Sequence, residues 1–255
     1  MRVTLRLLLG SLLLATAGCN TSVSNESEAA RKPDLTPATL QMSDEQVTRR
    51  FHQIFYDRRT PWEHNKWLGI ETMQNPLDVW ITQEIIVETR PDFIIEAGAY
   101  AGGSAALWAM ILKQVNPEGR VISIDIEDKM GEARKLSIVQ ERVEYIVGSS
   151  TGADVVNRIK EEVGDKKVMV ILDSDHRKPH VLSELKIYSE MVPLGGYLIV
   201  QDSNINGHPA KPGWGEGPME AIVEFLSTTD EFEADRTRER MLISFNPNGF
   251  LKRVK

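Results

Sequence analysis

The stretch ILDSDHRKPH, residues 171–180, places two aspartates and two histidines directly behind a run of aliphatic residues. Three interpretations are open: a metal site built on the two histidines, the acid–base neighbourhood of a reaction, or a solvated strand-to-helix turn. A His-x-x-x-His pair binds one metal when both side chains lie on a single helix face. Pro179 fits best in the first turn of a helix, so His176 should precede that helix and His180 should lie just inside it. The stretch is therefore predicted to act through Asp173 and His176, with His180 as a capping or surface histidine.

Acidic and amide side chains end two neighbouring strands of the predicted sheet. Asp173 ends one buried strand, and Gln201 and Asp202 end the next. In an open α/β sheet, ligands bind beyond the carboxyl ends of the strands. Oxygen ligands from two adjacent strands suit a hard cation such as Mg²⁺. The alternative is that Asp173, Asp175 and Asp202 only cap helices, but the convergence of three acids on one edge favours a magnesium site.

A glycine-rich turn, EAGAYAGGSA at residues 96–105, follows the first long predicted strand. Its glycines let the backbone turn tightly and approach a ligand closely. Tyr100 occupies the place of the second glycine in the dinucleotide pattern G-x-G-x-x-G, which argues against NAD. The run E-x-G-x-x-x-G-G, which starts at Glu96, resembles instead the first motif of S-adenosylmethionine-dependent methyltransferases. Alone, this motif does not exclude a glycine turn without a ligand.

Asp125 ends the next predicted strand, 27 residues after Gly98. An acid in this place accepts hydrogen bonds from ribose hydroxyls in dinucleotide folds, and the spacing suits one strand–helix–strand step. The two motifs together therefore predict a crevice for S-adenosylmethionine (SAM). The residues expected to form it are Glu96, Gly98, Tyr100, Gly102, Ser104, Asp125, Ser149 and Asp175.

An alternating order of strands and helices is needed to bring these residues to one edge. The predicted strands span residues 92–98, 120–127, 142–148, 166–173 and 196–202. Helices are expected between them, including a polar one at 129–140. Before them, a capping box at Ser43 and Gln46 begins a helical preface, with helices to about Tyr56 and over 75–91.

The end of the chain offers two further strands, at 231–236 and 241–246, which we expect to form a closing β-hairpin. Strands and helices in this order imply parallel units with helices on both faces of one sheet. The fold class predicted is therefore α/β, with a doubly wound, mostly parallel Rossmann-like sheet and an N-terminal helical preface.

The first residues have the pattern of a signal peptide, with Arg2 and Arg6, an apolar run at 7–15 and small residues before Cys19. The apolar run is shorter than the about 20 residues that a membrane-spanning helix needs. The sequence TAGC resembles the bacterial lipobox, and this resemblance implies that Cys19 is lipidated. A lipid there would anchor the protein to the membrane of the bacterial cell envelope.

The domain organisation follows from this pattern. Residues 1–18 are expected to be the signal peptide, residues 19–42 a flexible polar tether, and residues 43–255 the methyltransferase-like domain. A start of translation at Met42 is the alternative, and it would give a cytoplasmic protein without a lipid. The net charge is −7 and the lysines and arginines are scattered, so we expect no nucleic-acid partner.

Three blocks of the sequence, at residues 67–105, 172–209 and 217–226, resemble the rhamnosyl O-methyltransferase/cephalosporin hydroxylase family. The resemblance implies that Asp173, Gln201 and Asp202 occupy Mg²⁺-ligand positions. It also implies that His176 occupies the position of a general base. Gln201 stands where the related sugar methyltransferases have a carboxylate, so this site carries one negative charge fewer.

The function implied by the resemblance is metal-dependent methyl transfer from SAM to a hydroxyl of a sugar, a glycolipid or a related small molecule. The alternative is an exported lipoprotein that keeps a methyltransferase fold and binds a ligand without turnover. Should His176 not be the base, His208 in the glycine-rich loop at 207–218 is the next candidate. The partners expected are a small-molecule or lipid-linked sugar substrate and, through the lipid, a membrane, and the sequence leaves a homo-oligomer open.

Overall fold

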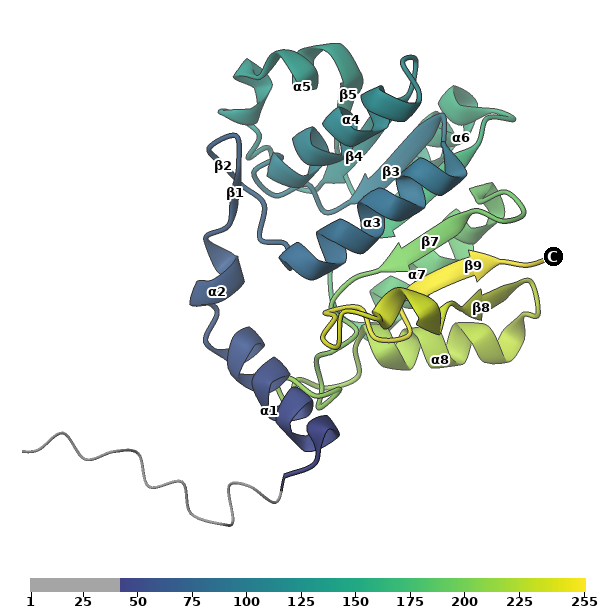
Figure 1. Cartoon of the computed structure of the whole chain (residues 1–255). Coiled ribbons are helices and arrows are strands. Elements are labelled where there is room, and N and C mark those ends of the chain that lie inside the picture. The colour runs from purple at the N-terminus through teal and green to yellow at the C-terminus, as the bar shows by residue number, and fades with distance from the viewer. Residues whose placement is uncertain (1–41) are drawn as a thin grey trace, which may run out of the picture. The chain divides into compact units, whose positions relative to one another are not determined.

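The computed structural model describes residues 42–255, coloured from purple to yellow in Figure 1. The predicted signal peptide, Cys19 and nearly all of the predicted tether lie outside the described residues. Within residues 42–255, no helix combines the length and the apolar composition that a membrane crossing requires.

A seven-stranded sheet forms the centre of the described chain, with the strand order β5-β4-β3-β6-β7-β9-β8. The five strands from β5 to β7 run parallel, and β9 pairs antiparallel with both β7 and β8. The central strands are runs of isoleucine and valine buried on both sides, as parallel sheets require. The strands are β3 Phe93–Ala97, β4 Arg120–Asp125, β5 Val143–Val147, β6 Val168–Leu172, β7 Tyr197–Val200, β8 Phe232–Ala234 and β9 Phe250–Arg253.

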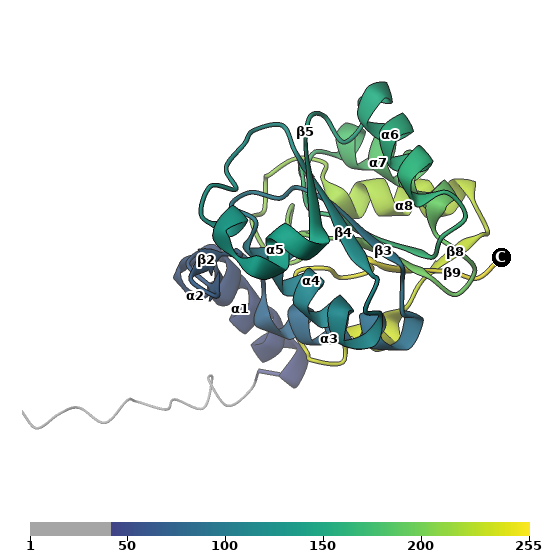
Figure 2. The same ribbon diagram turned by 90° about the horizontal axis from the view of Figure 1, so that it is seen from above.

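Helices cover both faces of this sheet, as Figure 2 shows from above. On one face lie α3 Pro76–Thr89, α4 Gly103–Val115 and α5 Ser137–Arg142, and on the other lie α6 Ala153–Val163, α7 Lys178–Tyr188 and α8 Pro218–Thr228. Each face buries its own apolar cluster, around Trp108 on the first and Tyr188 on the second. The predicted doubly wound α/β fold is confirmed.

The helical preface begins where the capping box predicts it. Ser43 accepts a hydrogen bond from the Gln46 N–H, and Gln46 accepts one in return, at the start of α1 Asp44–Asp57. A short helix, α2 Thr60–Glu63, and a small hairpin of β1 Lys66–Trp67 with β2 Ile70–Glu71 follow, and neither is part of the sequence prediction.

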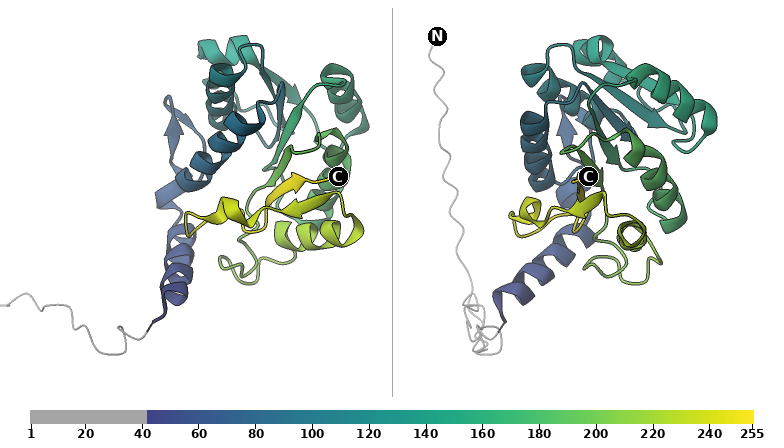
Figure 3. Two further views of the ribbon diagram at one scale, coloured as in Figure 1. Left: turned by 45° about the vertical axis from the view of Figure 1, so that its right-hand side comes forward. Right: turned by 90° about the vertical axis from the view of Figure 1, so that its right-hand side faces the viewer.

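Helix α1 packs along the loop that follows β7, and Figure 3 shows the two side by side in both of its views. Gln53 donates a hydrogen bond to the Pro209 carbonyl, and Arg49 donates one to the Gly207 carbonyl. Tyr56 and Trp62 complete a third apolar cluster with residues of this loop and of the C-terminal segment. The preface is therefore attached to the strand ends that carry the predicted chemistry.

Two predicted elements are wrong in detail. Residues 241–246 do not form a strand, because Phe245 turns into the third apolar cluster and its N–H donates to the buried carboxylate of Asp78. The second strand of the closing pair is β9 instead, which lies between β7 and β8. The helix predicted at 129–140 is only a 3-10 turn at Ala133–Lys135 followed by the short α5.

Candidate active site

A cavity of about 670 Å³ lies at the carboxyl ends of the parallel strands, where ligands bind in open α/β sheets. Its volume is within the range of small-molecule and cofactor sites. The predicted site residues that line it are Gly98, Tyr100, Ser104, Asp125, Asp173, Asp175, His176 and Asp202. The cavity therefore joins the predicted cofactor crevice to the predicted metal site.

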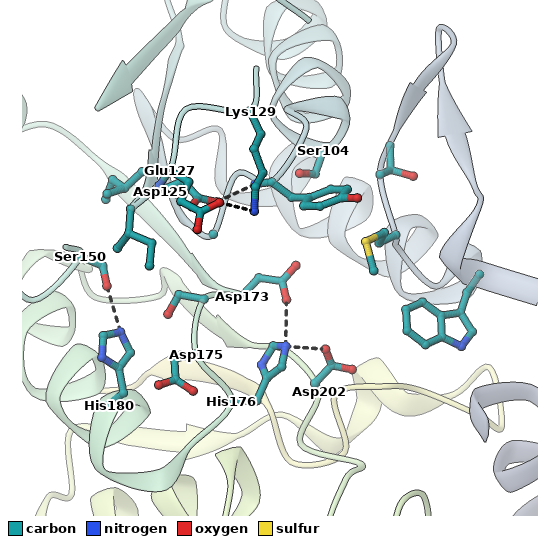
Figure 4. Close-up of a pocket in the computed structure, with 18 of the residues that line it drawn as sticks. Ser104, Asp125, Glu127, Lys129, Ser150, Asp173, Asp175, His176, His180 and Asp202 are labelled. Atoms are coloured by element: carbon teal, nitrogen blue, oxygen red, sulfur yellow. Dashed lines mark hydrogen bonds and ion pairs between the residues drawn. The ribbon is translucent and has the colours of Figure 1, made fainter. Parts of the chain in front are cut away.

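At the centre of this cavity, Asp173, His176 and Asp202 approach one another (Figure 4). Asp173 directly follows β6, and Asp202 follows β7 with a left-handed backbone, φ 55°. The His176 Nε2 atom lies 3.1 Å from Asp202 Oδ2 and 4.0 Å from Asp173 Oδ1. One ligand atom from each residue lies within 4.8 Å of the other two, so the three groups are close enough to share a metal ion.

The electrostatics of this cluster favour a cation. Burial, and then the neighbouring charge of Asp202, raise the pKa of Asp173 well above its usual range. Buried like charges disfavour each other's ionised form, and a divalent cation between them removes that penalty. The donor set of two carboxylates beside an imidazole therefore fits a hard cation held mainly by oxygen.

The glycine turn and the metal-site turn are fixed against each other by Gly98. Its φ is +97°, and a Cβ built on it would lie only 2.0 Å from the carbonyl oxygen of Asp173. The Asp173 N–H in turn donates to the Ala97 carbonyl at 2.7 Å. Gly98 therefore permits close contact between two turns of the site, in addition to the close approach of a ligand expected from the sequence.

Asp125 is positioned by two backbone donors. Its Oδ2 accepts the Tyr100 N–H at 2.8 Å, and its Oδ1 accepts the Glu127 N–H at 3.1 Å. Because a carboxylate oxygen has two lone pairs, both oxygens keep acceptor capacity on the cavity side. This arrangement suits the recognition of a diol such as a ribose.

The sequence profile of the Rhamnosyl O-methyltransferase/CmcI family matches residues 59–254. A curated rhamnosyl O-methyltransferase of Mycobacterium leprae is 35% identical over 213 residues, which are 81% of this chain and 90% of the relative. One of Mycobacterium tuberculosis H37Rv is 36% identical over 212 residues, or 81% of this chain and 85% of the relative. The chain belongs to the rhamnosyl O-methyltransferase/CmcI family.

Solved structures agree with this assignment at the level of the fold. A structure of CmcI with Mg and SAM has a TM-score of 0.59 at 19% identity, and covers 77% of this chain and 78% of CmcI. An apo structure of CmcI has a TM-score of 0.57 at 20% identity, with 76% and 77% covered. The matches confirm the predicted family, the α/β fold and the enzyme class of the prediction, an O-methyltransferase.

Several predicted cofactor residues lie outside the cavity wall of this family member. Glu96 is fully buried and accepts hydrogen bonds from Trp108 Nε1 at 3.0 Å and Ser123 Oγ at 2.6 Å. Burial raises its pKa. Gly102 caps α4 with φ 83°, and Ser149 bonds to Thr151 on the surface.

Two further predicted residues also lie outside the wall. The N–H of Gln201 donates to the Leu172 carbonyl, and its side chain is buried rather than part of the cavity lining. His208 Nε2 lies 2.9 Å from Glu220 Oε1, and the residue does not line the cavity either. That Gln201 binds the metal and that His208 is the alternative general base both stay predictions.

The sequence predicts His180 as a capping or surface histidine, but α7 has no side-chain cap and His180 lines the cavity instead. It lies in the first turn of α7, as Pro179 predicts, but it lines the cavity and its Nε2 is 3.1 Å from Ser150 Oγ (Figure 4). The buried carboxylate of Glu184, 3.2 Å away, raises the pKa of His180 by hydrogen bonding. Ser150 and Glu184 are separated from each other by 34 positions, and no local pattern links them.

Side chains of the preface also line the cavity, among them Tyr56, Trp62 and Met73. Lys211 comes from the loop after β7, and its Nζ lies 5.5 Å from the centre of the Tyr56 ring and 5.0 Å from that of Trp214. The Trp214 Nε1 donates to the His176 carbonyl at 3.3 Å. The rings of Tyr56 and Trp62 therefore line the cavity beside the three-residue cluster, and Trp214 lies next to this lining through its contact with Lys211.

Proposed function

We propose that this protein transfers a methyl group from SAM to a hydroxyl of a sugar, a glycolipid or a related small molecule, in a reaction that depends on Mg²⁺. The observation that carries the proposal is the single cavity in which Asp125 and the cluster of Asp173, His176 and Asp202 all lie. The curated relatives named rhamnosyl O-methyltransferases, at 35–36% identity, support the reaction class.

SAM is proposed to occupy the end of the cavity formed by the glycine turn and Asp125. The free lone pairs of Asp125 would accept hydrogen bonds from the ribose hydroxyls. Tyr100, Ser104, Ser150 and His180 also line this cavity. CmcI, which shares the fold, has been solved with Mg and SAM.

Asp173 and Asp202 would hold the cation, because Mg²⁺ prefers oxygen ligands to imidazole nitrogen. A bound Mg²⁺ supplies positive charge that lowers the pKa of an acceptor hydroxyl. Gln201, one residue before Asp202, has an uncharged amide, so the two carboxylates supply the negative charge of the three-residue cluster.

His176 is then free to act on the proton. Its Nε2 faces both carboxylates, at 4.0 Å from Asp173 and 3.1 Å from Asp202, so it would be near a hydroxyl held beside them. The imidazole would take the hydroxyl proton as general base, and the hydroxyl oxygen would attack the methyl carbon of SAM. The methyl–sulfur bond would break as the carbon–oxygen bond forms, and the electron pair of the broken bond would stay on sulfur, which gives S-adenosylhomocysteine.

The acceptor is proposed to enter beside Tyr56, Trp62 and Trp214. Aromatic rings next to polar groups suit a ligand with both apolar faces and hydroxyls, such as a sugar. The curated relatives are named rhamnosyl O-methyltransferases, and a sugar acceptor of this kind would fit beside these rings.

The experiment that tests the proposal measures release of S-adenosylhomocysteine from SAM in the presence of rhamnosides that differ in their free hydroxyls. We expect turnover with Mg²⁺, and its loss when a chelator is added or when Asp202 is replaced by asparagine. Turnover that is the same in chelator would contradict the role of the cation. A wild-type protein that binds SAM but methylates none of the tested rhamnosides would contradict the proposed class of acceptor.

A further inference from the structure

The two carboxylates proposed to hold the cation each receive one hydrogen bond from outside the sheet. Tyr56 Oη donates to Asp202 Oδ1 at 3.0 Å, and Gln74 Nε2 donates to Asp173 Oδ2 at 3.0 Å. Tyr56 is in the last turn of α1, and Gln74 lies between β2 and α3. Both donors are buried, with 3% and 5% of their surface exposed.

These bonds occupy one oxygen of each carboxylate and leave the other facing the cavity. These other oxygens, Asp202 Oδ2 and Asp173 Oδ1, are the two that face His176 Nε2, at 3.1 Å and 4.0 Å. A carboxylate can rotate about its Cβ–Cγ bond, so an outer hydrogen bond decides which oxygen is presented and in which direction. Here both outer bonds present the remaining oxygens toward one point.

The chemistry of the two donors is as informative as their position. A phenol and a primary amide carry no charge, so they orient the carboxylates without neutralising them. A lysine or arginine in either place would have paired with the acid and reduced its attraction for a cation. Neutral outer donors add no positive charge beside the pair, so they do not compete with a bound cation.

The donors are themselves held firmly by the preface. The Tyr56 ring packs against Trp62 and Phe245, with ring centres 5.1 Å and 4.7 Å apart. The Trp62 Nε1 donates to the Tyr56 carbonyl, and the Gln74 carbonyl accepts a hydrogen bond from Asn65. A donor fixed in this way keeps its partner carboxylate in one orientation.

We infer that Tyr56 and Gln74 are positioning residues of the cation site, so that the preface completes this site in addition to packing against the sheet. The inference rests on the proposed function, because it concerns the cation that Asp173 and Asp202 are proposed to hold. Outer-sphere partners of metal ligands typically change metal affinity by about 10–100-fold when they are removed. A purely structural role would change the stability of the fold and leave cation affinity unaltered.

The test uses Mn²⁺ as a spectroscopic probe and needs no turnover. Free Mn²⁺ is titrated with the cofactor-free protein and followed by the loss of its electron paramagnetic resonance signal. The variants are Tyr56→Phe and Gln74→Met, which remove the donors and keep the size of the side chains. We expect each to weaken Mn²⁺ binding by about 10-fold or more.

Matched controls are available in the same chain. Tyr197→Phe removes another buried tyrosine hydroxyl that donates to an aspartate, Asp235, at the opposite end of β7. Gln53→Met removes another amide donor of the preface, which bonds to the Pro209 carbonyl. Both controls should bind Mn²⁺ like the wild type, and melting temperatures recorded on all samples show which variants are folded.

The outcomes separate the inference from the proposed function. If the wild type binds Mn²⁺ and Asp202→Asn does not, but Tyr56→Phe and Gln74→Met bind it as their controls do, the inference is overturned and the cation site stands. If Asp202→Asn binds Mn²⁺ like the wild type, the cation site itself is wrong. Should Tyr56→Phe fail to fold, Gln74→Met decides, because its donor lies outside α1.

Discussion

Replacing His176 with alanine should separate proton transfer from the binding of either ligand. The imidazole is 26% exposed, and its Nε2 lies 3.1 Å from Asp202 Oδ2. General-base catalysis is worth about 10²–10⁴ in rate, or roughly 3–5 kcal/mol of transition-state stabilisation, and we expect turnover to fall by this factor.

The assay combines release of S-adenosylhomocysteine with separate titrations of SAM and of Mn²⁺. Because Mg²⁺ and Mn²⁺ are expected on the carboxylates of Asp173 and Asp202, the alanine variant should keep both affinities within a few-fold of the wild type. The exposed His64 in the preface provides a control, and His64→Ala should turn over normally. Normal turnover by His176→Ala would refute its role as base. Loss of Mn²⁺ binding together with turnover would show that His176 is a ligand.

Three further predictions concern the cofactor, the pH dependence of stability and the N-terminus. Asp125→Ala should weaken SAM binding by about 1–3 kcal/mol, measured by calorimetry, because the ribose hydroxyls and the Tyr100 N–H lose their acceptor. Burial lowers the pKa of His52 from 6.5 to about 4, so the unfolded state binds more protons between these values and stability is lost as pH falls through that window. This difference in pKa corresponds to roughly 3 kcal/mol of unfolding free energy. Denaturant unfolding should therefore show that His52→Gln loses less stability than the wild type between pH 6.5 and pH 4. An equal loss of unfolding free energy in the two proteins would contradict the role of His52. Finally, we propose that Cys19 carries a lipid, so Cys19→Ser should move the full-length protein out of the membrane fraction, whereas a native N-terminus at Met42 would exclude the anchor.

The fold and part of the site could be predicted because their signals are local. The five parallel strands appear in the sequence as runs of isoleucine and valine, and each is followed within a few residues by the groups that line the cavity. Asp125 and Asp173 could be placed in this way, because a residue at the carboxyl end of a strand is at the ligand edge of the sheet. Pro179 likewise marked the start of α7 correctly.

The remaining parts of the site depend on contacts between distant positions. Tyr56 bonds to Asp202 across 146 positions and Gln74 bonds to Asp173 across 99, and neither spacing has a periodic signature. His180 looked like a surface residue because Glu184 and Ser150, which hold it at the cavity, are recognisable only in three dimensions. The strand predicted at residues 241–246 is absent for a similar reason. Phe245 is buried against the preface, and this burial outweighs the preference of phenylalanine for a strand.

The most direct test of the proposed site is a pair of calorimetric titrations, with SAM and with Mg²⁺, on the wild type, on Asp125→Ala and on Asp202→Asn. We expect the wild type to bind both ligands, Asp125→Ala to lose affinity for SAM while it keeps Mg²⁺, and Asp202→Asn to lose Mg²⁺ while it keeps SAM. The proposed site would be contradicted if the wild type bound no SAM. It would also be contradicted if each variant lost affinity for SAM and for Mg²⁺ to the same extent, because the cavity would then not have separate cofactor and metal ends.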